Sequence, residues 1–185
     1  MTLRIVKVGG SLHDLPDLGP RLRALLGRTR TLLVPGGGPT ADAIRTLDRV
    51  HALGEEAAHW LALRAVSVNA HFLALLLPEA RVVPSLPRST DAGDWFILDA
   101  YAFFQKDDHR PGALPHRWQV TSDSLAVRVA VRAEARELVL LKSVSAAGGA
   151  WDGIVDGFFP EAMRQAPELA VRVINLRAMG PHSRE

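Results

Sequence analysis

Short runs of β-branched and leucine residues alternate along the chain with segments in which apolar residues recur every three or four positions. The short runs predict strands at 3–8, 31–34, 81–83, 95–98, 137–142 and 171–174. The periodic segments predict helices at 17–27, 40–53, 55–77, 122–135 and 160–168. Strands that alternate with helices predict an α/β fold, a three-layer αβα sandwich around a mainly parallel central sheet with an antiparallel strand at an edge.

Composition excludes several classes of protein. The 185 residues are 48% hydrophobic and 23% charged, which suits a single domain with a full core over 1–185. The absence of cysteine excludes disulfides, thiolate metal sites and a cysteine nucleophile. A net charge of +2 gives no reason to expect nucleic acid, and no apolar run approaches the roughly 20 residues of a membrane helix. With no readable signal peptide, we expect a cytoplasmic protein without nucleic-acid or membrane partners.

Lysine is scarce in this chain, where Lys7, Lys106 and Lys142 stand against 19 arginines. A composition that drifts towards arginine keeps lysine where a compact ammonium on a flexible stem is needed. Lys7 and Lys142 each lie at the end of a predicted strand, which suggests such a need. Lys106 lies in a stretch without apolar periodicity, and chance survival explains it equally well.

Two glycine-rich segments follow predicted strands. In Lys7-Val-Gly-Gly-Ser11, bare backbone amides can form an anion-binding nest beside an ammonium, although an ordinary glycine turn is the simpler alternative. Val34-Pro-Gly-Gly-Gly-Pro-Thr40 precedes a predicted helix, whose N-terminus attracts phosphate or carboxylate. A flexible turn is the alternative there, but three successive glycines are entropically costly. Neither segment is a Walker A loop or a dinucleotide-binding fingerprint.

The segment 120–126 supplies an acidic residue to the same region. Ser122 or Asp123 suits the N-cap of the predicted helix, and Asp123 can also hold nearby lysines and keep them charged. Ligands of parallel sheets bind at the carboxyl ends of the strands, where Lys7 and Lys142 are expected. Two lysines, two anion-binding loops and one aspartate suit phosphoryl transfer without a covalent intermediate. Taken alone, Lys142 could merely close a buried strand.

The motifs at 7–11, 34–38, 121–126 and 141–144, in this order, resemble those of the amino acid kinase superfamily across nearly the whole chain. The resemblance implies an ATP-dependent kinase with Lys7, Asp123 and Lys142 as catalytic residues. The ATP-binding residues that it implies are Lys7, Gly9, Gly10, Ser11, Lys142, Ser143, Val144, Asp152 and Asp156. The acceptor-binding residues that it implies are Gly36, Gly37, Gly38, Thr121 and Ser122. Mg²⁺ would arrive with the nucleotide and have no direct protein ligand.

Residues 114–126 and 140–144 are most similar to a small-kinase branch of methanofuran biosynthesis and its bacterial relatives in one-carbon metabolism. This resemblance implies (5-(aminomethyl)furan-3-yl)methyl phosphate as the acceptor and its diphosphate as the product. About 1–115 would bind the acceptor and about 116–185 the nucleotide. A uridylate or isopentenyl phosphate acceptor, and an inactive nucleotide- or oxyanion-binding protein of the same fold, are the alternatives.

Several side chains have less certain places in this scheme. The acceptor's ammonium needs a carboxylate, for which Asp91, Asp94 and Asp99 are candidates by location, although solvated loop acids are the simpler interpretation. His13 follows the first glycine pair and could contact phosphate, whereas the seven histidines together lack the spacing of a zinc site. The predicted helix 55–77 is apolar over more than one face, which favours a homodimer or higher homo-oligomer.

Overall fold

The computed structural model describes residues 3–145 and 153–179. The strands are β1 (Arg4–Val8), β2 (Thr31–Pro35), β3 (Arg81–Val83), β4 (Trp95–Leu98), β5 (Glu137–Lys142) and β6 (Ala170–Asn175). The helices are η1 (Gly10–Leu12), α1 (Leu18–Leu26), α2 (Gly38–His51), α3 (Glu55–Leu76), α4 (Ala100–Asp107), α5 (Ser122–Arg132) and α6 (Phe159–Arg164). All six predicted strands and five predicted helices are therefore present, and α4 is a helix that the apolar pattern did not predict.

The strands form one sheet in the order β3-β4-β2-β1-β5-β6. Each neighbouring pair within the described parts of the chain is parallel, so the predicted antiparallel edge is wrong. The reason lies in the loop 84–94, which connects β3 to β4. This loop runs from the carboxyl end of β3 back to the amino end of β4, so the two strands are parallel. Arg30 and Arg81 hold this loop there by donating to its carbonyl oxygens at Arg88, Asp91, Ala92 and Gly93.

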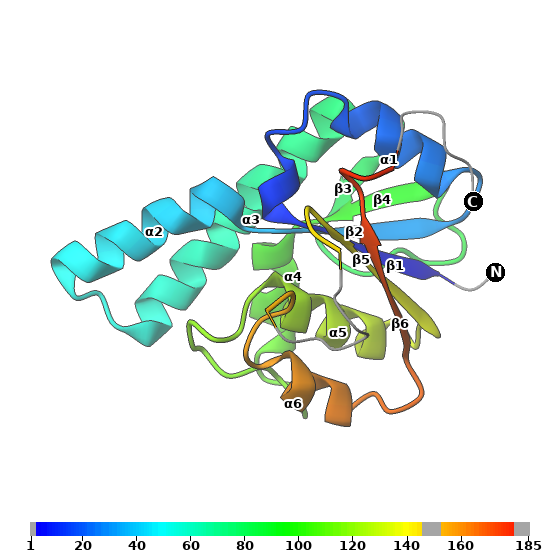
Figure 1. Cartoon of the computed structure of the whole chain (residues 1–185). Helices are drawn as coiled ribbons and strands as arrows, with labels where there is room; N and C mark the ends of the chain where they lie inside the picture. Colours follow the sequence, from blue (N-terminus) through cyan, green and yellow to red (C-terminus); the bar gives the residue numbers. More distant parts are fainter. Residues whose placement is uncertain (1–2, 146–152, 180–185) are drawn as a thin grey trace.

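Helices cover both faces of the sheet, which confirms the predicted three-layer αβα sandwich (Figure 1). α1 and the second half of α3 pack on one face, around Leu22, Leu73 and Ile97. α4, α5 and α6 pack on the other face. No helix in the ranges 3–145 and 153–179 is both long enough and apolar enough to cross a membrane.

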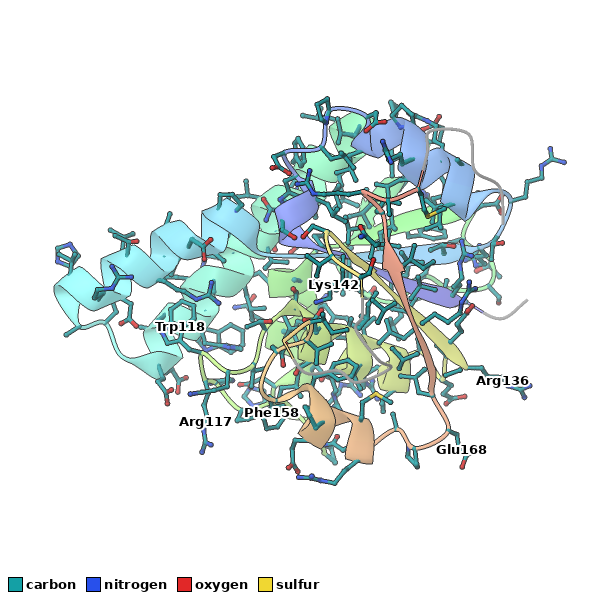
Figure 2. All side chains as sticks on the ribbon, viewed as in Figure 1. Arg117, Trp118, Arg136, Lys142, Phe158 and Glu168 are labelled. Atoms are coloured by element: carbon teal, nitrogen blue, oxygen red, sulfur yellow. The ribbon has the colours of Figure 1, made fainter. Side chains whose placement is uncertain are left out.

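The hairpin of α2 and the first half of α3 projects beyond the sheet (Figure 1). Its turn places Ala52 and Gly54 at positive φ, and Leu47, Val50 and Leu53 remain exposed. Arg117 and Trp118 lie beside this hairpin (Figure 2), and the Trp118 indole donates to Asp48 of α2 at 2.8 Å. Oligomerisation through the apolar helix α3 stays a prediction.

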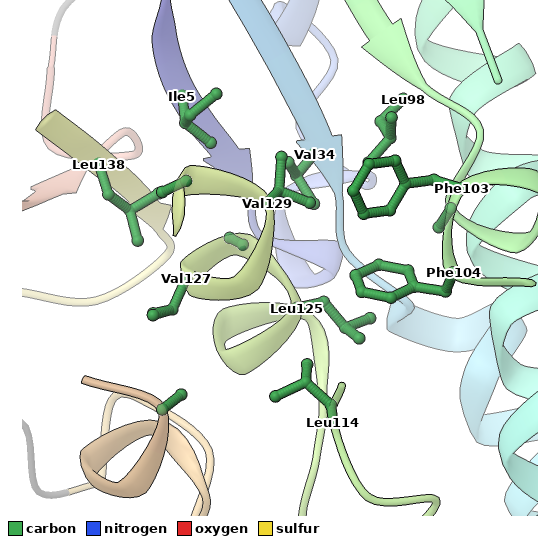
Figure 3. Close-up of a cluster of buried hydrophobic side chains, with 14 of the residues drawn as sticks. Ile5, Val34, Leu98, Phe103, Phe104, Leu114, Leu125, Val127, Val129 and Leu138 are labelled. Atoms are coloured by element: carbon green, nitrogen blue, oxygen red, sulfur yellow. The ribbon is translucent and has the colours of Figure 1, made fainter. Parts of the chain in front are cut away.

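Side chains alternate between the two cores along each strand, as the twofold period of a strand requires. Ile5 of β1 and Leu138 and Leu140 of β5 belong to the core that contains α5 (Figure 3). Val6, Val8, Val139 and Leu141 belong to the core that contains α1. Lys7 and Lys142 have the parity of the first set, so both lysines are directed to the α5 side of the sheet.

Candidate functional site

Lys7 and Lys142 lie at the carboxyl ends of two adjacent strands. Lys7 is opposite Leu140 in the parallel register of β1 and β5, and Lys142 follows two residues later on the same face (Figure 2). Both side chains are buried, with 4% and 9% of their surface exposed. Burial of two ammonium groups is costly unless an anion compensates them.

Asp123, in the first turn of α5, is that anion. The Lys7 Nζ lies 2.9 Å from its Oδ1, and the Lys142 Nζ lies 2.8 Å from Oδ1 and 2.7 Å from Oδ2. The carboxylate is itself only 4% exposed. The structure thus brings the three predicted catalytic residues into one cluster, and Asp123 does more than close a helix end.

The cluster carries a net positive charge because two ammonium groups share one carboxylate. Burial alone would raise the pKa of Asp123, but the charges of Lys7 and Lys142 outweigh burial and hold that pKa below its ordinary value. Burial and the charge of Lys7 lower the pKa of Lys142, against the opposing attraction of Asp123. An anion placed beside the two lysines would balance the charge and favour their protonated forms.

The two glycine-rich loops pack directly on each other. A Cβ added to Gly10 would lie 2.1 Å from the Gly38 nitrogen, and one added to Gly36 would lie 2.3 Å from the Gly10 nitrogen. Gly38 also has a φ of +52°, which disfavours any side chain. The run of glycines therefore has a structural cause in this loop crossing, whether or not a ligand also approaches it.

Asn69 of α3 holds the second glycine loop, and the sequence analysis missed it. Its Nδ2 donates to the carbonyl oxygens of Gly36 at 2.7 Å and Gly37 at 2.8 Å, and also contacts the Thr40 hydroxyl. The side chain is only 3% exposed. The sequence contained a signal for this role, because the Asn69 side-chain amide lies within the apolar segment 55–77. A polar group buried in such a segment needs hydrogen-bond partners.

A cavity of about 260 Å³ opens beside the glycine loops. Gly37, Gly38, Thr121 and Ser122 line it, which are four of the five residues predicted for the acceptor. Gly10 and Ser11, which were predicted for ATP, line the same cavity, so the roles of both sets stay predictions. Gly36 lies behind the wall and is bonded to Asn69. The lining also includes Asp42, Arg45, His59, Arg117 and Trp118, which the sequence did not assign to the acceptor. Because residues before and after position 115 line the cavity, a division of substrates at that point stays a prediction.

Comparisons with known proteins agree with this geometry, although no protein-family model matches the chain. The chain is 26% identical over 163 residues to the [5-(aminomethyl)furan-3-yl]methyl phosphate kinase of Methanocaldococcus jannaschii, covering 84% of this chain and 69% of that protein. The fold of the present chain is similar to that of uridylate kinase from Archaeoglobus fulgidus (TM-score 0.62, 14% identity, 94% of this chain and 90% of that one). UMP kinase from Ureaplasma parvum is similar to the same degree (TM-score 0.64, 12% identity, 95% and 90% coverage). The chain is thus similar in sequence to a phosphate kinase and similar in fold to UMP kinases.

The residues predicted to bind ATP lie in three places. Gly9, Gly10 and Ser11 follow β1, and Ser143 and Val144 follow β5, so both segments are at the carboxyl edge of the sheet. The Ser11 and Ser143 hydroxyls lie 2.9 Å apart, which joins the two segments. Asp152 lies outside the described residues. Asp156 is bonded to the start of α5, and nucleotide contacts for all of these residues stay predictions.

The three acidic residues suggested for the acceptor's ammonium do not line the cavity. Asp91 and Asp94 lie before β4, at the opposite edge of the sheet, and the Asp91 carboxylate accepts the Arg88 amide. Asp99 follows β4 but caps α4, because its Oδ1 accepts the Ala102 amide and the Ser67 hydroxyl. The sequence located these residues in loops without showing which edge of the sheet each loop reaches. Asp42 is the carboxylate that lines the cavity.

Two histidines stack beside the cavity. The rings of His59 and His116 are 4.7 Å apart, and the His116 Nε2 lies 2.7 Å from Asp108. Burial, followed by the charge of His116, lowers the pKa of His59 to about 4, so His59 is neutral at pH 7. The His13 ring packs against Phe72, and burial and the charge of Lys7 lower the pKa of His13. A phosphate contact of His13 stays a prediction.

Proposed function

We propose that this kinase transfers the γ-phosphate of ATP to the phosphate group of a small acceptor, (5-(aminomethyl)furan-3-yl)methyl phosphate, and so forms a diphosphate. The observation that carries the proposal is the buried Lys7–Asp123–Lys142 cluster. Ser122, which precedes Asp123 in the sequence, lines the cavity of about 260 Å³. The Methanocaldococcus relative, which bears the name of this activity, supports the choice of acceptor.

Positioning and charge stabilisation provide the catalysis in this scheme. An oxygen of the acceptor phosphate attacks the γ-phosphorus, the bond to the β–γ bridging oxygen breaks, and ADP leaves. The ammonium groups of Lys7 and Lys142 stabilise the charge on the transferred group, while Asp123 holds them in place. The Gly9 amide already donates to the Leu141 carbonyl oxygen at 2.9 Å. The backbone amides of Gly10 and of Gly37–Gly38 would therefore bind the donor and acceptor phosphates.

Mg²⁺ is the metal that this chemistry implies. No group of three or more His, Asp or Glu side chains suited to a metal lies within 3–145 and 153–179, and Asp123 is already paired with two lysines. These residues fit an ion that is held by the phosphates of ATP. When bound there, Mg²⁺ would neutralise phosphate charge.

The cavity has room for a small acceptor, since its volume is about 260 Å³. The Asp42 carboxylate would bind the acceptor's ammonium, and the Trp118 and His59 rings would contact the furan. These contacts replace the loop acids that the sequence suggested.

Turnover of ATP to ADP with a panel of acceptors tests the proposal. We expect the aminomethylfuran phosphate to support turnover, with UMP and isopentenyl phosphate giving far less. Preference for either of those two would change the acceptor and keep the chemistry. ATP binding with no turnover on any acceptor would contradict the proposed activity and favour the inactive binding protein.

Asp42→Asn tests the ammonium contact separately. We expect it to raise the KM for the aminated acceptor by about tenfold, the scale of one charged hydrogen bond, while kcat changes little. The matched comparison is an acceptor with hydroxymethyl in place of aminomethyl, for which wild type and variant should have equal KM. An equal rise in KM for both acceptors would show that Asp42 does not bind the amine.

A further inference from the structure

Asp156 follows Asp123 by 33 residues in sequence, yet it contacts the start of the same helix. Its Oδ2 accepts the Thr121 amide at 3.0 Å, the Thr121 hydroxyl at 2.8 Å and the Ser124 amide at 3.0 Å. Its Oδ1 accepts the Ser124 hydroxyl and, at 3.2 Å, the Phe158 amide. The Asp156 amide in turn donates to Asp123 Oδ2 at 3.2 Å.

These bonds give α5 the cap that its own sequence does not supply. The first amides of a helix lack partners within the helix and are usually satisfied by the side chain of the N-cap residue. Thr121 is the N-cap of α5 but makes no capping bond with its side chain. Its hydroxyl donates to Asp156, which takes over the capping role from a distant segment.

We propose that Asp156 is a positioning residue, which fixes the first turn of α5 and so aims the Asp123 carboxylate at Lys7 and Lys142. The catalytic part of this inference rests on the proposed kinase activity, whereas the geometric part does not. The carboxylate of Asp156 reaches residues on both sides of Asp123, and its amide reaches Asp123 directly. A shift of this turn would move Asp123 relative to both ammonium groups.

The bonding of Asp156 distinguishes this role from the nucleotide contact that the family resemblance implies. Both carboxylate oxygens are occupied by donors from the chain, three on Oδ2 and two on Oδ1. A ribose hydroxyl could bind only by competing with bonds that hold α5. Positioning predicts a loss in kcat, and nucleotide contact predicts a loss in the affinity for ATP.

Steady-state kinetics of Asp156→Asn separates these two roles. A misplacement of about 1 Å at a reacting centre costs up to about a hundredfold in rate, so we expect kcat to fall by about ten- to a hundredfold with little change in the KM for ATP. Asp107→Asn is the matched control, because Asp107 is a buried carboxylate bonded to Arg128 and Arg132 at the other end of α5. It should lower stability and keep kcat. A raised KM for ATP with unchanged kcat in Asp156→Asn would overturn the inference.

A measurement independent of activity uses the three lysines of the chain. With lysine labelled with ¹³C at Cε, NMR should give separate signals for Lys7, Lys142 and the exposed Lys106. Asp156→Asn should move the Lys7 and Lys142 signals and leave Lys106 unchanged, whereas Asp107→Asn should leave Lys7 and Lys142 unchanged. Shifted signals in a protein without kinase activity would support positioning and contradict the proposed function.

Ser124→Ala provides a milder variant if Asp156→Asn does not fold. It removes one of the five donors to Asp156 and keeps the carboxylate. We expect the same two lysine signals to move, by a smaller amount, with a smaller fall in kcat. Folded variants whose Lys7 and Lys142 signals coincide with those of the wild type would overturn the inference.

Discussion

The lysine–aspartate cluster and the cavity that we propose for the acceptor differ in construction. The side chains of Lys7, Asp123 and Lys142 are 5%, 6% and 11% exposed, and they lie on two central strands and the start of a buried helix. The cavity is lined partly by the projecting α2–α3 hairpin, where the Asp42 and Arg45 side chains are 66% and 41% exposed. In the proposed function, the core of the fold therefore fixes the chemistry, while substitutions in the hairpin can change the acceptor without disturbing it.

The largest expected effect is on the buried side of this comparison. Lys142→Ala should lower kcat by about a hundred- to a thousandfold, the usual cost of losing one group that stabilises transition-state charge. The comparison variant is Lys106→Ala, which removes an exposed ammonium from α4 and should keep kcat. Turnover assays should be accompanied by thermal unfolding of both variants. A folded Lys142→Ala enzyme with normal kcat would remove this lysine from the mechanism.

The second effect is an alkaline loss of activity. Because burial and the charge of Lys7 lower the pKa of Lys142 in the free protein, kcat/KM for ATP should fall about tenfold per pH unit from a pH below the ordinary lysine value of about 10.4. Lys7 promotes this deprotonation and Asp123 opposes it. Between the folded and unfolded pKa values, only the unfolded state binds the proton, so stability should rise with pH in that window.

A pH profile of kcat/KM for ATP, together with denaturant unfolding at each pH, measures both quantities. Lys142→Arg supplies the control, since arginine does not deprotonate in this range. Any residual activity of this variant should not fall at alkaline pH. An unchanged alkaline fall in Lys142→Arg would assign the fall to a different group.

Asn69 holds the second glycine loop, of which Gly37 lines the cavity, and should have a smaller effect. Asn69→Leu leaves the Gly36 and Gly37 carbonyl oxygens without their donor, which should destabilise the protein by about 1–3 kcal/mol. We expect the acceptor KM to rise by about tenfold, equivalent to about 1.4 kcal/mol, with a lesser change in kcat. Ser67→Ala, on the same helix but bonded to Asp99, should leave the acceptor KM unchanged. Equal acceptor KM values in the two variants would show that the bonds of Asn69 to the second glycine loop do not affect acceptor binding.

The smallest effect concerns His59 at the wall of the cavity. Its pKa of about 4 means that the unfolded state binds a proton that the folded state lacks between about pH 4 and 6.5. Stability should therefore decrease as the pH falls through this window, by at most about 3 kcal/mol. NMR titration of the ring and unfolding of His59→Gln, which should lack this decrease, test it. A titration midpoint near 6.5 would contradict the lowered pKa.

Most of the fold and the cluster could be predicted, because both depend on short-range patterns. Lys7 lies two residues after Ile5 and Lys142 two residues after Leu140, so each lysine points to the same face of the sheet as that apolar residue. The antiparallel edge failed because the path of loop 84–94 depends on tertiary contacts of Arg30 and Arg81. The cavity residues Asp42 and Arg45 looked like any exposed helix surface, since nothing local shows what packs opposite them. Asp156 was located in the right region, but its bonds to α5 depend on a contact across more than 30 residues.

The crossing of the two glycine loops has a consequence for how substrates are bound. Gly10, Gly36 and Gly38 leave no free space between the segment that follows β1 and the segment that follows β2. A ligand that displaces either segment must therefore displace the other as well. Occupancy of the donor site should alter the affinity for the acceptor, and by thermodynamic reciprocity the acceptor should alter the affinity for ATP by the same factor.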